Sequence, residues 1–88
     1  MSDRPSQARA AAEELAGTFR KLDEECASLF DQIALMIPDL IEGDYDVLIA
    51  RKLRAVSDLL NSEGPSLGVV RAMRKLLDEV REAFGNRD

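Results

Sequence analysis

Hydrophobic side chains recur through the first half of the chain at alternating spacings of four and three residues. The positions are Ala8, Ala12, Leu15, Phe19, Leu22, Cys26, Leu29, Ile33 and Met36. This heptad spacing is typical of a coiled coil or a long helical hairpin. Ser6 precedes the pattern as a candidate N-cap, and Pro38 disfavours the helical conformation at Ile37. The pattern therefore predicts one helix over residues 6–37, about 45 Å long.

Two shorter helices are predicted after an acidic turn over residues 38–45. The first covers about 46–61 and the second about 66–84, with the break Gly64-Pro65 between them and Ser66 as a cap. Their apolar stripes are Ile49, Leu53, Val56 and Leu60, then Val69, Met73, Leu76, Leu77, Val80 and Phe84. No segment has a strand pattern. We expect an all-α fold in which the long helix packs with a C-terminal two-helix hairpin as a three-helix bundle-like domain over 6–88, preceded by a disordered tail over 1–5.

The unequal helix lengths predict a dimer. At 1.5 Å per residue the hairpin helices reach about 24 and 28 Å and cover little more than half of the long helix. The N-terminal part of that helix would then expose a dimer seam, which comprises Ala8, Ala12, Leu15, Phe19 and Leu22. Two-fold dimers are the commonest oligomers, so a homodimer completing the fold is expected. The alternative is a monomer in which the alanine-rich start frays or stays solvated.

The residue inventory argues against an enzyme. The 88 residues contain no histidine and no tryptophan, and the five glycines do not form a phosphate-binding loop. Cys26 falls at a heptad position, where a buried thiol is a small core residue rather than a nucleophile. We expect no catalytic residues and no cofactor.

A cluster of carboxylates in the connector is the one candidate for a cation site. It comprises Asp39, Glu42, Asp44 and Asp46. Counted as a calcium loop from Glu42, Val47 would stand where glycine is required and Leu53 where the bidentate glutamate is required. We therefore expect solvated connector acids and charges at a helix N-terminus, and no metal site.

The net charge of −5 is unevenly distributed. Residues 13–46 contain ten acidic and two basic residues, whereas residues 47–88 contain eight basic and six acidic ones. One interpretation is that exposed charge pairs steer the hairpin onto the long helix. The other is an acidic face that binds a basic protein partner, formed by Glu13, Glu14, Glu24 and Glu25.

A basic face on the two shorter helices suggests an alternative function. It comprises Arg51, Lys52, Arg54, Arg71, Arg74 and Lys75, which could contact phosphates. A sequence pI of about 4.7 and the scarcity of aromatic residues argue against nucleic-acid binding.

The sequence thus predicts a non-enzymatic protein–protein interaction module. We expect a small acidic helical homodimer that acts as an inhibitor, antiactivator, escort chaperone or assembly subunit. A nucleic-acid-associated regulator using the basic face is the alternative. A cytoplasmic location without membrane contact is expected, because no signal peptide is visible and the longest apolar run, Ile33–Ile37, is far shorter than the roughly 20 residues that span a bilayer.

Overall fold

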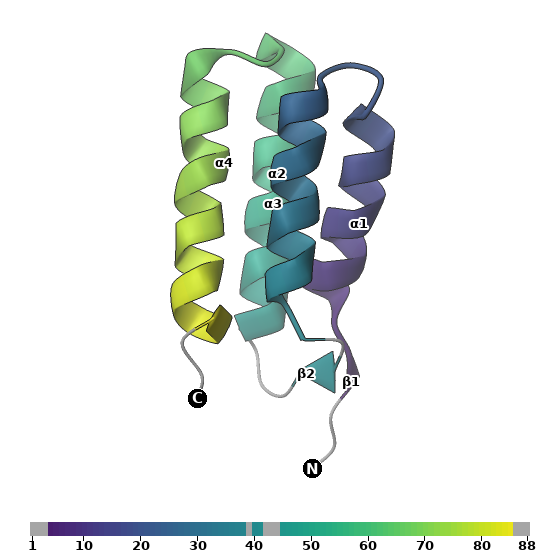
Figure 1. The fold of residues 1–88 in the computed structure, drawn as a ribbon, viewed down its shortest axis with the longest axis vertical. Coiled ribbons are helices and arrows are strands. Elements are labelled where there is room, and N and C mark those ends of the chain that lie inside the picture. Colours follow the sequence, from purple (N-terminus) through teal and green to yellow (C-terminus); the bar gives the residue numbers. More distant parts are fainter. Residues whose placement is uncertain (1–3, 39, 42–44, 86–88) are drawn as a thin grey trace.

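The computed structural model describes residues 4–38, 40–41 and 45–85. Within these residues the chain forms a bundle of four α-helices that run alternately up and down its long axis (Figure 1). They are α1 (Gln7–Phe19), α2 (Glu24–Met36), α3 (Tyr45–Glu63) and α4 (Leu67–Val80), and α4 continues into a π-helical turn, η1 (Arg81–Gly85). The predicted all-α class is confirmed.

The helices do not pack in simple chain order. α1 packs against α2 and α3, and α4 also packs against α2 and α3. The consecutive helices α2 and α3 therefore stand at opposite corners of the bundle. The connection between them lies at the same end of the bundle as the start of α1 (Figure 1) and contains the short strand β2 (Leu40–Ile41), which pairs antiparallel with β1 (Arg4–Pro5).

The single helix predicted over 6–37 is instead two helices joined by a turn. α1 ends at Phe19, whose carbonyl accepts hydrogen bonds from the backbone N–H groups of Leu22 and Asp23 at 3.0 and 2.9 Å. Asp23 is extended and its carboxylate accepts a hydrogen bond from Glu25 N at 2.9 Å, so it caps α2. Folding the chain back here lets α2 cover α1, and Phe19 stacks on Phe30 with ring centroids 6.0 Å apart.

This turn removes the basis of the predicted dimer seam. Ala8, Ala12 and Phe19 are at most 3% exposed within one chain, and Leu15 is partly buried against the core. Only Leu22, in the turn, is widely exposed, at 56%. Ala8, Ala12 and Phe19 are therefore core residues of the bundle, because α2 and α3 supply the cover that a second chain was expected to give.

The second half follows the predicted segments closely. α3 ends at Glu63, and Gly64 follows with φ of 77°, the left-handed conformation that glycine adopts without steric cost. Ser66 Oγ then accepts a hydrogen bond from Val69 N at 3.3 Å and caps α4. Leu53, Met73 and Val80 are fully buried at the centre of the bundle.

The disordered tail predicted over 1–5 is only partly described. Arg4 and Pro5 form β1 and are thus ordered by pairing with Ile41 and Leu40, whereas residues 1–3 lie outside the described part. Backbone pairing across the connection was not visible in the sequence, because a two-residue strand has no periodicity.

Candidate functional site

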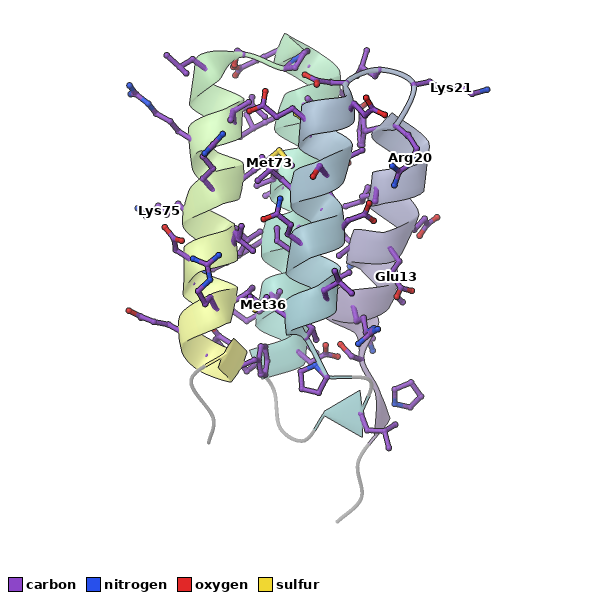
Figure 2. All side chains as sticks on the ribbon, in the orientation of Figure 1. Glu13, Arg20, Lys21, Met36, Met73 and Lys75 are labelled. Atoms are coloured by element: carbon purple, nitrogen blue, oxygen red, sulfur yellow. The ribbon has the colours of Figure 1, made fainter. Side chains whose placement is uncertain are left out.

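A groove runs along the outside of the bundle between α3 and α4. Its volume is about 280 Å³. Its lining residues are Lys52, Ala55 and Val56 of α3 with Ala72, Lys75, Leu76 and Glu79 of α4. The alanine, valine and leucine side chains give it an apolar floor, and the two lysines and the glutamate stand at its rim. Lys75 points away from the bundle (Figure 2).

An ion pair between Lys52 and Glu79 fixes which residues of the two antiparallel helices lie level with each other. Leu59 is seven positions after Lys52, and Ala72 is seven positions before Glu79. Seven residues are nearly two full turns, so Leu59 and Ala72 lie level, on the same sides of their helices as the ion pair. Leu59 is 41% exposed. A large apolar side chain on α3 thus stands beside a small one on α4.

On this surface the sign of the charge changes along each helix and also across the groove, from α3 to α4. Towards the lower end in Figure 1, α3 carries Arg51 and Lys52 and α4 carries Glu79 and Glu82. Towards the upper end, α3 carries Asp58 and Glu63 and α4 carries Arg71 and Lys75. We call the surface formed by the groove, Leu59 and these eight charged residues the α3–α4 face. Asp78 adjoins this face and lines a pocket with Lys52 and Lys75, so acidic side chains are at least as numerous here as basic ones.

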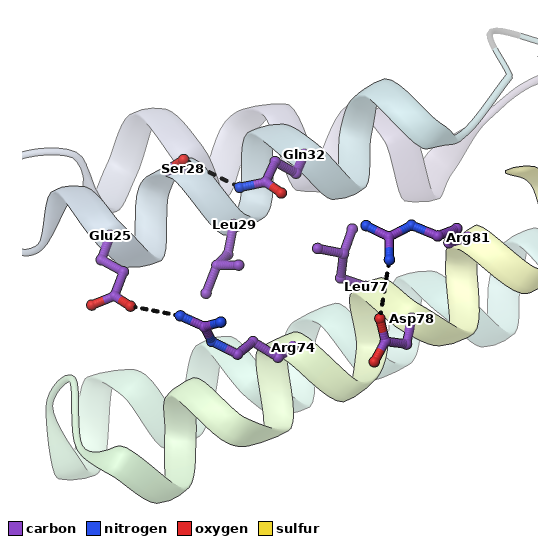
Figure 3. Close-up of a pocket in the computed structure, with 8 residues that line it drawn as sticks. All are labelled: Glu25, Ser28, Leu29, Gln32, Arg74, Leu77, Asp78 and Arg81. Carbon is purple, nitrogen blue, oxygen red and sulfur yellow. Dashed lines mark hydrogen bonds and ion pairs between the residues drawn. The ribbon is translucent and has the colours of Figure 1, made fainter.

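A second groove, between α2 and α4, is polar and has a volume of about 430 Å³ (Figure 3). Arg74 reaches across it to Glu25 at 3.1 Å, and Arg81 lies 3.4 Å from Asp78. Its charged side chains therefore already pair with one another, which leaves less affinity for an external charged ligand.

The four acidic residues predicted to form one partner-binding face are divided between two antiparallel helices, α1 and α2. Glu25 lies in the α2–α4 groove, where it pairs with Arg74. Glu13 pairs with Arg9 at 3.3 Å on α1, and Glu14 and Glu24 are exposed. The break after Phe19 causes this separation, because α1 and α2 are antiparallel and not one continuous helix.

The six basic residues predicted as a nucleic-acid face are also divided. Lys52 pairs with Glu79 and Arg74 with Glu25, while Arg51, Arg54, Arg71 and Lys75 are exposed. On α3 and α4 these bases alternate with acids. A duplex placed there would meet carboxylates as well as bases, which opposes phosphate binding.

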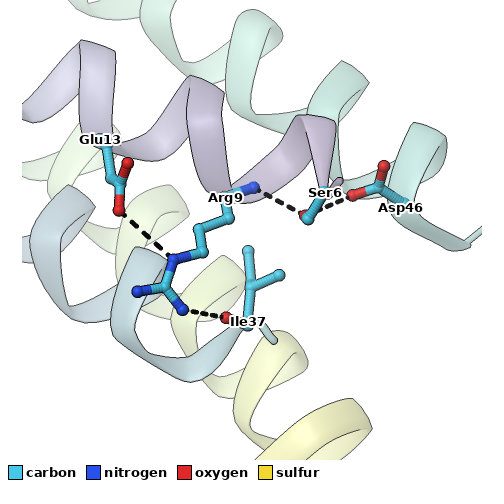
Figure 4. Close-up of polar contacts among 5 residues, drawn as sticks. All are labelled: Ser6, Arg9, Glu13, Ile37 and Asp46. Atoms are coloured by element: carbon cyan, nitrogen blue, oxygen red, sulfur yellow. Dashed lines mark hydrogen bonds and ion pairs between the residues drawn. The ribbon is translucent and has the colours of Figure 1, made fainter. Parts of the chain in front are cut away.

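Asp46 was expected to be a solvated connector acid or a charge at a helix N-terminus. It lies in the first turn of α3, and its side chain is completely buried. Its carboxylate accepts a hydrogen bond from Ser6 Oγ at 2.7 Å (Figure 4). It also accepts hydrogen bonds from the backbone N–H groups of Gln7 and Ala8, both at 2.9 Å. Ser6 in turn accepts from Arg9 N at 3.0 Å, as the predicted N-cap of α1. The first turn of α3 thus holds the N-terminus of α1. Asp39, Glu42 and Asp44 lie outside the described residues.

Arg9 ties the same end of α1 to α2. Its Nη1 donates to the carbonyl oxygen of Ile37 at 2.8 Å, just after the last turn of α2 (Figure 4). The carbonyls at a helix C-terminus lack intrahelical partners and attract a cation. Arg9 and Asp46 are therefore structural residues that the sequence did not reveal.

Cys26 is buried in the core, as the heptad position predicts. Burial, reinforced by the neighbouring carboxylates of Asp23 and Glu25, raises the pKa of the thiol above its ordinary value of 9.0. Its Sγ lies 3.8 Å from Asp23 Oδ2. A protonated, enclosed thiol is a poor nucleophile.

Among the described residues, no three histidine, cysteine, aspartate or glutamate side chains are grouped so that they could hold a metal ion. In that same part of the chain no helix combines the length and the apolar character needed to cross a membrane. No protein family, curated protein or solved structure matches the chain.

Proposed function

We propose that this chain is a non-enzymatic protein–protein interaction module and that the α3–α4 face is its binding surface. The observation that carries this is the exposed apolar groove with charges of both signs at its rim. Protein interfaces combine an apolar centre with a polar rim, and small residues allow the backbone of a partner helix to approach closely.

A nucleic-acid partner is less well supported by the same surface. Arg51, Lys52, Arg71 and Lys75 share the face with at least as many acids, which weakens the uniform positive potential that phosphate binding uses. An enzymatic function has no support from Cys26, because the thiol is buried and its pKa is raised.

A matched pair of variants tests the proposal. Ala55→Glu places a carboxylate in the groove, whereas Ala10→Glu makes the same change at an exposed position of α1. Both should fold, because glutamate is a good helix former. In affinity capture from the native host followed by mass spectrometry, we expect Ala55→Glu to reduce the recovered partner about tenfold or more, and Ala10→Glu to leave it unchanged.

Equal recovery with both variants would show that the partner binds elsewhere. A gel shift with generic duplex and single-stranded probes at low salt tests the nucleic-acid alternative directly. Binding that Arg51→Ala and Arg71→Ala remove, and that Ala10→Glu does not, would replace the proposed function by nucleic-acid binding.

A further inference from the structure

We infer that the protein bound at the α3–α4 face is a second copy of the same chain, related by a two-fold axis parallel to the helices. The inference rests on the proposed function and names its partner. Self-association requires a surface that is complementary to itself. Two independent features of the α3–α4 face meet that requirement.

The first feature is the distribution of charge. At the lower end Arg51 and Lys52 of α3 stand beside Glu79 and Glu82 of α4, and at the upper end the signs are reversed. A rotation about an axis along the groove places α3 of one copy over α4 of the other at the same level. Bases then face acids at both ends. An axis perpendicular to the helices would also pair bases with acids, so the charges favour self-association, and the choice of the parallel axis rests on side-chain size.

The second feature is the distribution of side-chain size. Leu59 projects from α3 beside the small side chain of Ala72, at the same level of α4. The same rotation brings Leu59 of each copy over Ala72 of the other. A large side chain then meets a small one twice, which is the arrangement that packs two helical layers without voids.

The size of the face sets the expected affinity. α3 has 19 residues and is about 28 Å long, and two adjacent helices are about 20 Å wide. The face therefore offers roughly 550 Å² on each chain, less than the ~800 Å² per partner of a standard interface. We expect a dissociation constant in the micromolar range, and a largely dimeric protein at about 0.5 mM.

A charge-swap pair tests both the face and the orientation by sedimentation equilibrium. One variant is Arg71→Glu with Lys75→Glu, and the other is Asp58→Lys with Glu63→Lys. In a homodimer of either variant, like charges lie opposite each other in both contacts between α3 of one copy and α4 of the other. The dissociation constant of each homodimer should therefore rise about tenfold or more. Mixed at equal concentrations the two variants should form a heterodimer of nearly wild-type affinity, because acids again face bases in both contacts.

The control is Glu14→Lys with Lys21→Glu, two exposed residues of the other hairpin, which should leave the dissociation constant unchanged. Circular dichroism checks that every variant keeps its helicity. Dimers that persist in both charge-swap variants would show that another surface associates. If the mixed variants did not regain nearly wild-type affinity, a two-fold axis parallel to the helices would be excluded. A two-fold axis perpendicular to the helices would still leave like charges opposite each other in the heterodimer.

The outcome also separates this inference from the proposed function. A wild-type chain that keeps its 9.8 kDa mass at about 1 mM overturns self-association. Capture of a different protein, lost with Ala55→Glu and kept with Ala10→Glu, would in that case still support the interaction module. Dimerisation of the purified chain together with the charge-swap recovery supports the inference.

Discussion

Asp46 in the first turn of α3 accepts a hydrogen bond of 2.7 Å from Ser6 Oγ, forty positions earlier in the chain. Two backbone N–H groups at the start of α1 bind the same carboxylate at 2.9 Å each. The positive end of one helix is therefore neutralised by a side chain of another. This contact joins the two hairpins of the bundle.

We expect Asp46→Ala to lower the free energy of unfolding by about 2 to 4 kcal/mol. The change leaves Ser6 Oγ and the N–H groups of Gln7 and Ala8 without their partner in an enclosed site. Urea denaturation followed by circular dichroism measures the loss. Glu14→Ala, at an exposed position of α1 outside the α3–α4 face, is the control and should stay within about 0.5 kcal/mol of wild type. Equal effects would show that the carboxylate does not hold α1.

Two glycine substitutions should change stability in opposite directions. Gly64→Ala should cost about 1 kcal/mol, because Gly64 has φ of 77°. Gly17→Ala should stabilise by about 0.5 to 1 kcal/mol, because a Cβ on this helical residue meets no atom within 4 Å. Thermal melts of the two variants decide the signs.

Truncation of a central leucine should be far more costly than truncation of an exposed one. Leu53 is 0% exposed, whereas Leu35 is 76% exposed. We expect Leu53→Ala to cost about 2 to 5 kcal/mol through the lost burial and the cavity left behind. Leu35→Ala should change stability by less than about 0.5 kcal/mol. Similar melting temperatures for both variants would contradict the assignment of the core.

The helices of the second half could be predicted because their boundaries are encoded locally. Gly64, Pro65 and Ser66 mark a stop and a new cap within three consecutive residues. The break between α1 and α2 was missed because Phe19, Leu22 and Cys26 continue the heptad spacing through it, with neither glycine nor proline in the turn. The signal that was present is Asp23 followed by Glu24 and Glu25, a cap and two acids at a helix start.

The candidate surface could be predicted only in part. Lys52, Arg71 and Lys75 were singled out by charge, but Ala72 and Glu79 were not. Their role depends on which residues of α3 and α4 lie level, and that register is a tertiary property absent from either helical pattern. The burial of Asp46 was missed for the same reason, since its partners lie 38 to 40 positions away.

The raised pKa of Cys26 predicts a thiol that is unreactive in the folded protein. Burial disfavours the thiolate, so alkylation by iodoacetamide at pH 8 should be at least about a hundredfold slower than in the urea-unfolded chain. Mass spectrometry of quenched samples measures both rates. Rapid labelling of the native protein would show that α2 exposes the thiol.

The same shift predicts how Cys26 affects stability with pH. The unfolded thiol ionises near its ordinary value of 9.0, below the pKa of the folded state. Above pH 9 the unfolded state therefore binds fewer protons than the folded state, and the free energy of unfolding should fall as pH rises through this window. Cys26→Ala should remove this part of the decline, although it also lowers stability at pH 7 by truncating a buried side chain. Urea titrations at pH 7 and about pH 10 measure how much the free energy of unfolding falls with pH in the wild type and in Cys26→Ala. The difference between these two falls is the contribution of the thiol.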